Sequence, residues 1–241
     1  TVTATQSATS SKVGTTFYNV CAGGFSSRLN TGTDFADGTF RIGNGRITAY
    51  REVGSTAIGD INAGGFVGRL LGYGTEQTTI TNYDNVNSYY AIQSGTVNNA
   101  TIYYSDNSYV EAACHSYNSI NHTSNLGNNV CAGGAAGYVL GYETISNVSL
   151  IFDGTVHQSG KPAEYFVSGT QNGANNNDGD LKTEGIIGGM FGLVIDTKLS
   201  NINLIGDPTE NSVVYFTSTN SPNTASVGGL VGALWKMENV A

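Results

Sequence analysis

The sequence has few charged residues, and few of those are cations. Only 12% of its 241 residues are charged, against roughly 25% in typical soluble domains. Ten Lys and Arg oppose eighteen Asp and Glu, which gives a net charge of −8, and the cations form no cluster. Because binding to nucleic acid or to an anionic membrane surface needs clustered cations, the sequence predicts neither kind of partner.

Long apolar runs and helical patterns are also missing. The longest apolar run, residues 185–195 (GIIGGMFGLVI), is too short to cross a bilayer, so we expect no membrane insertion. No stretch shows apolar residues at a period of 3.6, which argues against amphipathic helices. Short segments rich in Ile, Val, Thr, Tyr and Phe, such as ATIYYSDNSYV, alternate between apolar and polar residues instead. This alternation is typical of strands.

The chain contains only three cysteines, Cys21, Cys114 and Cys131, and none lies in a CxxC or CxxCH motif. Their spacing indicates neither a zinc site nor attached haem, and we expect no cofactor. Two interpretations remain open for Cys114 and Cys131. Either they close a disulfide over the polar segment between them, or all three cysteines are small buried thiols.

The motifs of common catalytic sites are absent from the sequence as well. It contains no GxSxG nucleophile elbow and no phosphate-binding loop that ends in GK[ST], and its three histidines are scattered. The densest acidic group is Asp178, Asp180 and Glu184. Its spacing does not fit an EF-hand, so it is only a weak calcium candidate. We therefore expect a protein that is not an enzyme.

Glycine pairs recur five times along the chain and define an internal repeat. The copies begin near residues 21, 62, 131, 187 and 227, and four of them continue as G-G-x-x-G. A second block, apolar-x-Asn-apolar, follows each of those four. We interpret residues 1–241 as a single repeat array with insertions of variable length, part of a longer chain. The repeated residues are Gly64, Gly65, Gly133, Gly134, Gly188, Gly189, Gly228 and Gly229, followed by Asn82, Asn147, Asn201 and Asn239.

Short strands joined by tight glycine turns in a repeating order predict a parallel β-solenoid, in which each coil pairs with the coils above and below it. Gly-Gly suits a place where neighbouring backbones approach closely or where φ is positive. The Asn at the same place in each repeat predicts a buried ladder of side-chain amides that bond from coil to coil. A β-sandwich or jelly roll is the alternative all-β fold, but it leaves the repeat unexplained.

Three N-glycosylation sequons are present, at Asn99, Asn121 and Asn147. They carry carbohydrate only if the protein is secreted through a glycosylating pathway. Asn99 and Asn121 are the stronger glycosylation candidates, because the repeat places Asn147 in the predicted ladder.

The pattern G-G-[FLM]-[VF]-G followed by I-x-N-[VI] resembles the GLUG motif of bacterial and some protist surface proteins. The resemblance covers roughly residues 62–241, with a weak start near Cys21. This chain departs from the family in its uneven repeat length. It also has Tyr, Val or Ile after the Asn, where the family often has Cys. The resemblance implies a large, repetitive, secreted protein and transfers no catalytic residue.

Together these features predict an extracellular or cell-surface protein with a structural or adhesive role. It would be a stiff rod, stalk or filament component whose insertions form the contact surface. The expected partners are other copies of the chain, neighbouring surface proteins or glycans. A carbohydrate-active β-helix enzyme is an alternative, and it requires a groove with two or more carboxylates on one face. A carbohydrate-binding module is another.

Overall fold

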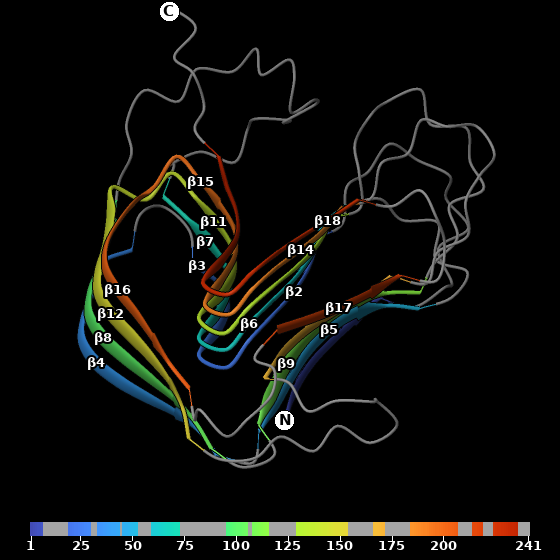
Figure 1. Cartoon of the computed structure of the whole chain (residues 1–241), viewed down its shortest axis with the longest axis horizontal. Helices are drawn as coiled ribbons and strands as arrows, with labels where there is room; N and C mark the ends of the chain where they lie inside the picture. The colour runs from blue at the N-terminus through green and yellow to red at the C-terminus, as the bar shows by residue number, and fades with distance from the viewer. Residues whose placement is uncertain are drawn as a thin grey trace, which may run out of the picture.

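The structure is a computed structural model that describes residues 1–6, 19–29, 33–43, 45–52, 59–72, 95–105, 108–115, 129–153, 166–171, 184–206, 214–218 and 224–235. Within these residues the regular structure consists of nineteen β-strands, β1 to β19. The strands form four sheets in which all neighbours are parallel (Figure 1). The predicted all-β parallel solenoid is confirmed.

The chain passes through the four sheets in turn, and we number the sheets in that order. Sheet I contains β2 (Val20–Gly23), β6 (Ile61–Gly64), β10 (Val130–Gly133), β14 (Glu184–Gly188) and β18 (Thr224–Gly228). Sheet II contains β3 (Ser26–Leu29), β7 (Val67–Leu71), β11 (Ala136–Leu140), β15 (Phe191–Ile195) and β19 (Val231–Trp235). Sheet III contains β4 (Phe35–Ile42), β8 (Thr96–Tyr104), β12 (Thr144–Phe152) and β16 (Lys198–Ile205). Sheet IV contains β1 (Val2–Gln6), β5 (Arg46–Arg51), β9 (Tyr109–Cys114), β13 (Val167–Gln171) and β17 (Val214–Ser218).

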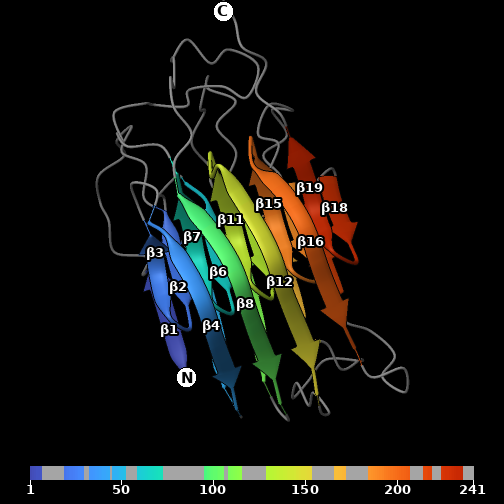
Figure 2. The ribbon, with the colours of Figure 1, turned by 90° about the vertical axis from the view of Figure 1, so that its left-hand side faces the viewer.

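One circuit through the sheets is one coil. Coils 1 to 4 are β2–β5, β6–β9, β10–β13 and β14–β17, and coil 5 contributes β18 and β19. Each coil therefore begins at one copy of the sequence repeat. The strands of neighbouring coils lie side by side in all four sheets, and Figure 2 shows this for sheet III.

The Gly-Gly pair forms the turn between the first two strands of every coil. The first glycines of the five pairs share one register position: Gly23, Gly64, Gly133, Gly188 and Gly228. The second glycines are hydrogen-bonded from coil to coil, for example from Gly134 N to Gly189 O at 3.2 Å. A Cβ atom at Gly65 would overlap the Tyr104 hydroxyl and the Gly134 carbonyl oxygen. Glycine is required there because two neighbouring coils and a side chain approach the same point.

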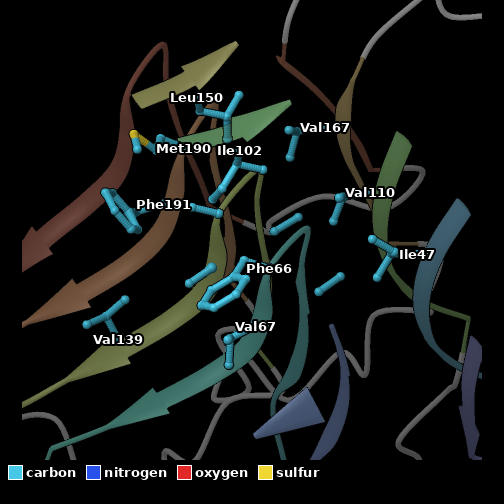
Figure 3. Packing of buried hydrophobic residues seen from close by; sticks show 14 of the residues in the cluster. Ile47, Phe66, Val67, Ile102, Val110, Val139, Leu150, Val167, Met190 and Phe191 are labelled. Atoms are coloured by element: carbon cyan, nitrogen blue, oxygen red, sulfur yellow. The ribbon is translucent and has the colours of Figure 1, made fainter. Parts of the chain in front are cut away.

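The main core is lined by residues of all four sheets, among them Ala22, Val67, Ile102 and Val110. The glycine turn between sheets I and II projects toward this core. The residue after the glycine pair points into it in coils 2 and 4: Phe66 is 6% exposed and Met190 is fully buried. Figure 3 shows both side chains in the same cluster as Ile102 and Leu150 of sheet III. Period-two alternation in the strands of sheet III supplies the apolar side chains that face this core.

A second, smaller core lies between sheets I and II, which diverge from the glycine turns as the two arms of a V (Figure 1). In β10, Val130 and Ala132 belong to the main core, whereas Cys131 between them belongs to the second. Successive side chains of a strand point to opposite faces, so sheet I separates the two cores. The buried members of the second core are Leu71, Cys131, Tyr138, Leu140, Ile186, Leu193 and Ile195.

Candidate functional site

One backbone feature repeats in every strand of sheet III. Asp37, Asn99, Asn147 and Asn201 all have positive φ, between 51° and 55°. They lie opposite one another in neighbouring strands. In each pair of strands the residues before and after this position are register partners, but the residues at the position itself are not. Positive φ is costly for most L-residues, and Asn and Asp tolerate it best. The repeated Asn is therefore explained by a left-handed bulge in each strand.

Side-chain hydrogen bonds connect this column, which we call the left-handed column. Asn99 Nδ2 donates to Asp37 Oδ1 at 2.5 Å, and Asn201 Nδ2 donates to Asn147 Oδ1 at 2.7 Å. Asn147 Nδ2 donates to Oδ1 of Asn98, the residue before Asn99, at 2.9 Å. Side-chain amides do bond from coil to coil, but all these bonds are exposed.

Two details of the predicted asparagine ladder are therefore wrong. It is exposed rather than buried, because the bulge leaves two successive residues facing outward, Ser146 and Asn147, before Val148 turns inward. Its member in coil 2 is Asn99, not Asn82. Asn82 and Asn239 lie outside the described residues.

The sequence contained a signal for the correct member. Val97-Asn98-Asn99-Ala100 has the same apolar-x-Asn-apolar order as Ile145-Ser146-Asn147-Val148, and the two segments pair in register. The sequons at Asn99 and Asn147 therefore occupy equivalent sites, and the preference for Asn99 over Asn147 as a glycosylation candidate loses its basis. Asn121, the other candidate, lies outside the described residues.

The remaining outward side chains of sheet III also form columns across the strands. They are Asp34–Thr96–Thr144–Lys198, Ala36–Asn98–Ser146–Ser200, Thr39–Thr101–Ser149–Asn203 and Arg41–Tyr103–Ile151–Ile205. Hydrogen bonds again run between coils: Asp34 Oδ1 accepts from Thr96 Oγ1 at 2.9 Å, and Ser146 Oγ donates to Asn98 Oδ1 at 3.0 Å. Within the four strands, charged residues occur only in the first and the last, at Asp37, Arg41 and Lys198. Asp34, Glu143 and Asp153 flank the strands at their ends.

The second core has a charged end in coils 1 and 2. The Arg69 guanidinium lies over the Tyr138 ring, 4.5 Å from the ring centroid. Burial raises the pKa of Asp60, although Arg69 opposes this effect. Burial likewise raises the pKa of Tyr138 to about 12 and lowers the pKa of Arg28, the register partner of Arg69. The position of Arg28 and Arg69 is occupied by Tyr138 in coil 3, by Leu193 in coil 4 and by Ala233 in coil 5. The charged side chains therefore lie at one end of the second core.

Sheet IV contains a fully buried cation, Arg51. Its Nε donates to Gln6 Oε1 at 2.8 Å, and its terminal nitrogen donates to the Gly59 carbonyl at 3.0 Å. Burial lowers the pKa of Arg51. These contacts fasten β1 and the residues before β6 to β5, which is a structural role.

Of the two interpretations left open for Cys114 and Cys131, the disulfide is not formed, and both residues are buried thiols. Cys114 belongs to the main core and Cys131 to the second core. Sheet I therefore separates their side chains.

The weak calcium candidates are not brought together within the described residues. Asp178 and Asp180 lie outside them, and Glu184 Oε1 accepts a hydrogen bond from Ser226 Oγ at 2.8 Å. In the part of the chain that the structure describes, no three His, Cys, Asp or Glu side chains are grouped so that they could hold a metal ion.

No protein family profile, curated protein or solved structure that we compared matches the chain. Among the described residues there is no helix with the length and apolarity needed to cross a bilayer. The architecture of the chain is thus a parallel β-solenoid with an exposed polar face on sheet III.

Proposed function

We propose that this chain is a structural or adhesive solenoid segment of a secreted or cell-surface protein, built from GLUG-type repeats. The proposal depends on one observation: in every sheet, equivalent residues of neighbouring coils pair in register, from coil 1 to coil 5 in sheets I and II and from coil 1 to coil 4 in sheets III and IV. Such stacks gain their stability from contacts between neighbouring coils, so coils can be added without changing the design of the others.

The length of the stack matters for a rod. Neighbouring strands in a sheet lie about 4.8 Å apart, so five coils rise only about 20 Å. A rod therefore requires further coils or end-to-end association of copies. The uneven insertions of the sequence would lie on its sides and serve as contact surfaces.

The outer edges of coils 1 and 5 are candidate surfaces for further coils or for another copy of the chain. Val227 and Leu234 of coil 5 are 51% and 62% exposed, whereas their register partners Ile187 and Val194 in coil 4 are fully buried. At the other end Phe25 is 56% exposed, and it stacks on the buried Phe66 at 4.9 Å. Exposed core residues beside unpaired strand edges are surfaces for pairing with another chain. A head-to-tail contact of this kind does not close, so it would produce filaments.

Sedimentation velocity and negative-stain electron microscopy of the purified chain test this association. We expect a concentration-dependent series of oligomers that the Leu234→Lys variant abolishes. Glu143→Gln is the matched control, because it changes the net charge by the same amount at an exposed site away from the stack ends. A wild type that stays monomeric at all concentrations would contradict end-to-end assembly. Antibody labelling of intact source cells tests the location, and exclusively intracellular signal would contradict a surface role.

A further inference from the structure

We propose that the outer face of sheet III binds a neutral polysaccharide chain that lies across its strands. Figure 2 shows β4, β8, β12 and β16 side by side on the side of the molecule that faces the viewer. This proposal rests on the chemistry of the face and is independent of the end-to-end association proposed above.

The face is open to solvent. Asn98, Asn147 and Asn203, which lie on three successive strands, are all exposed. Sheet IV differs, because its outward residues Ser168 and Thr170 in coil 3 are 0% and 6% exposed. A long ligand can therefore reach several coils of sheet III at once.

The chemistry of the face selects the partner. The two middle strands present only uncharged groups outward, and most of them are hydroxyls and amides: Thr96, Asn98, Asn99, Thr101, Tyr103, Thr144, Ser146, Asn147, Ser149 and Ile151. Nucleic acids and acidic polymers need cations, which these strands lack. The core of a protein interface is usually apolar and aromatic, whereas here apolar contact is confined to one column at the edge. Hydroxyls and amides both donate and accept hydrogen bonds, as sugar hydroxyls do.

The polar groups are also held in place. Ser146 Oγ bonds to Asn98 Oδ1 at 3.0 Å, and Asn203 Nδ2 bonds to Ser149 Oγ at 3.5 Å. Side chains fixed before binding lose less conformational entropy when a ligand arrives. The guanidinium of Arg41 lies 4.1 Å from the ring centroid of Tyr103 and fixes that ring too. The guanidinium covers one face of the ring, so the apolar C–H face of a sugar can pack against the uncovered part of the ring and the neighbouring Ile151.

The repeat favours a polymer over a single sugar. Similar polar groups recur at every coil, about 4.8 Å apart, and each neutral hydrogen bond contributes little on its own. A chain with repeating hydroxyls contacts several coils together. We therefore expect the affinity to rise with oligosaccharide length until the four strands are spanned.

Affinity electrophoresis tests the proposal with gels that contain hydroxyethylcellulose, galactomannan or, as the anionic comparison, polygalacturonate. The probe that retards the chain is then titrated as oligosaccharides of increasing length. Ser149→Glu places a charge in the middle of the face, and Thr3→Glu adds the same charge on the outer side of sheet IV as the matched control. Circular dichroism and thermal unfolding verify that both variants are folded.

We expect a neutral polysaccharide to retard the chain and the affinity to grow with oligosaccharide length. Ser149→Glu should lower this affinity about tenfold, which corresponds to 1.4 kcal/mol. Thr3→Glu should leave it unchanged. Retardation by polygalacturonate alone, or no retardation in any gel, would overturn the proposal. So would neutral binding that Ser149→Glu leaves unchanged. If Ser149→Glu instead abolishes self-association and no glycan binds, the face is an interface between copies. The Leu234→Lys variant separates that result from end-to-end assembly.

Discussion

Asn201 donates a hydrogen bond from its Nδ2 to Oδ1 of Asn147 one coil earlier, and both residues have a left-handed backbone. The backbone conformation recurs at this position in all four strands of sheet III. The bond between equivalent residues recurs from Asn99 to Asp37, whereas Asn147 donates to Asn98, the neighbour of its equivalent residue. One residue type thus meets two requirements, because Asn tolerates positive φ and its amide can both donate and accept.

The two requirements can be separated by substitution at Asn147. Asn147→Ala loses the hydrogen bonds and strains the left-handed backbone, and each loss costs about 1 kcal/mol. We expect its free energy of unfolding to fall by about 2 kcal/mol. Asn147→Gly relieves the strain and should cost only about 1 kcal/mol. Urea denaturation measures both, and equal stabilities of the two variants would show that the backbone conformation contributes nothing.

The glycine turns offer a second comparison, between an inner coil and the last one. A methyl group at Gly65 would overlap the Tyr104 hydroxyl and the Gly134 carbonyl oxygen, whereas nothing lies within 4 Å of a Cβ atom at Gly229. We expect Gly65→Ala to lower the free energy of unfolding by about 3 kcal/mol or more, since overpacking a rigid site forces backbone shifts. Gly229→Ala should change it by less than about 0.5 kcal/mol. Thermal unfolding of both variants checks this, and similar losses would contradict the coil-to-coil contact.

The repeat and its turns could be predicted from the sequence because glycine leaves a strong signal. Gly-Gly recurs at the turn of every coil, and the next residue is apolar in all five copies. In coils 2 to 4 this residue is buried in the main core, as Phe66 is. Insertions of any length between these turns do not disturb the pattern. The stacking of coils followed from these local rules.

The polar face could not be placed in the same way. Positive φ sets two successive residues outward in each strand, which breaks the alternation from which burial is predicted. Asp37 takes the place of Asn in coil 1, so a search for Asn alone misses it. The charged end of the second core has no repeat signature either. Asp60 and Arg69 come together only because sheets I and II face each other.

The cysteines give a direct test of the two cores. We expect three thiols per chain when the unfolded protein is titrated without reductant, and no change of the thermal midpoint on adding reductant. Burial raises the pKa of Cys131 well above its usual range, so alkylation of this thiol in the folded protein should be slow. A Cys114–Cys131 cross-linked peptide in a non-reducing digest would contradict the placement of these residues in separate cores.

The Asp60 carboxyl predicts a specific dependence of stability on pH. Burial raises its pKa above the ordinary value of 3.8, against the opposing charge of Arg69. A raised pKa means that the folded chain binds this proton more tightly than the unfolded chain. The contribution of Asp60 to stability is therefore complete below pH 3.8 and is lost as the pH rises through the folded pKa.

Asp60→Asn imitates the protonated carboxyl and removes this titration. We expect the variant to match the wild type in acid and to exceed its free energy of unfolding at pH 7, because an amide costs less to bury than a carboxylate. The Asn side chain can still accept the hydrogen bond that Asn129 N donates to Asp60 Oδ1 at 3.3 Å. Asp60→Ala loses that acceptor and should be less stable than Asp60→Asn at every pH. Urea denaturation from pH 3 to pH 8 measures the three curves. An Asp60→Asn variant that is less stable than the wild type at pH 7 would show that attraction to Arg69 outweighs burial.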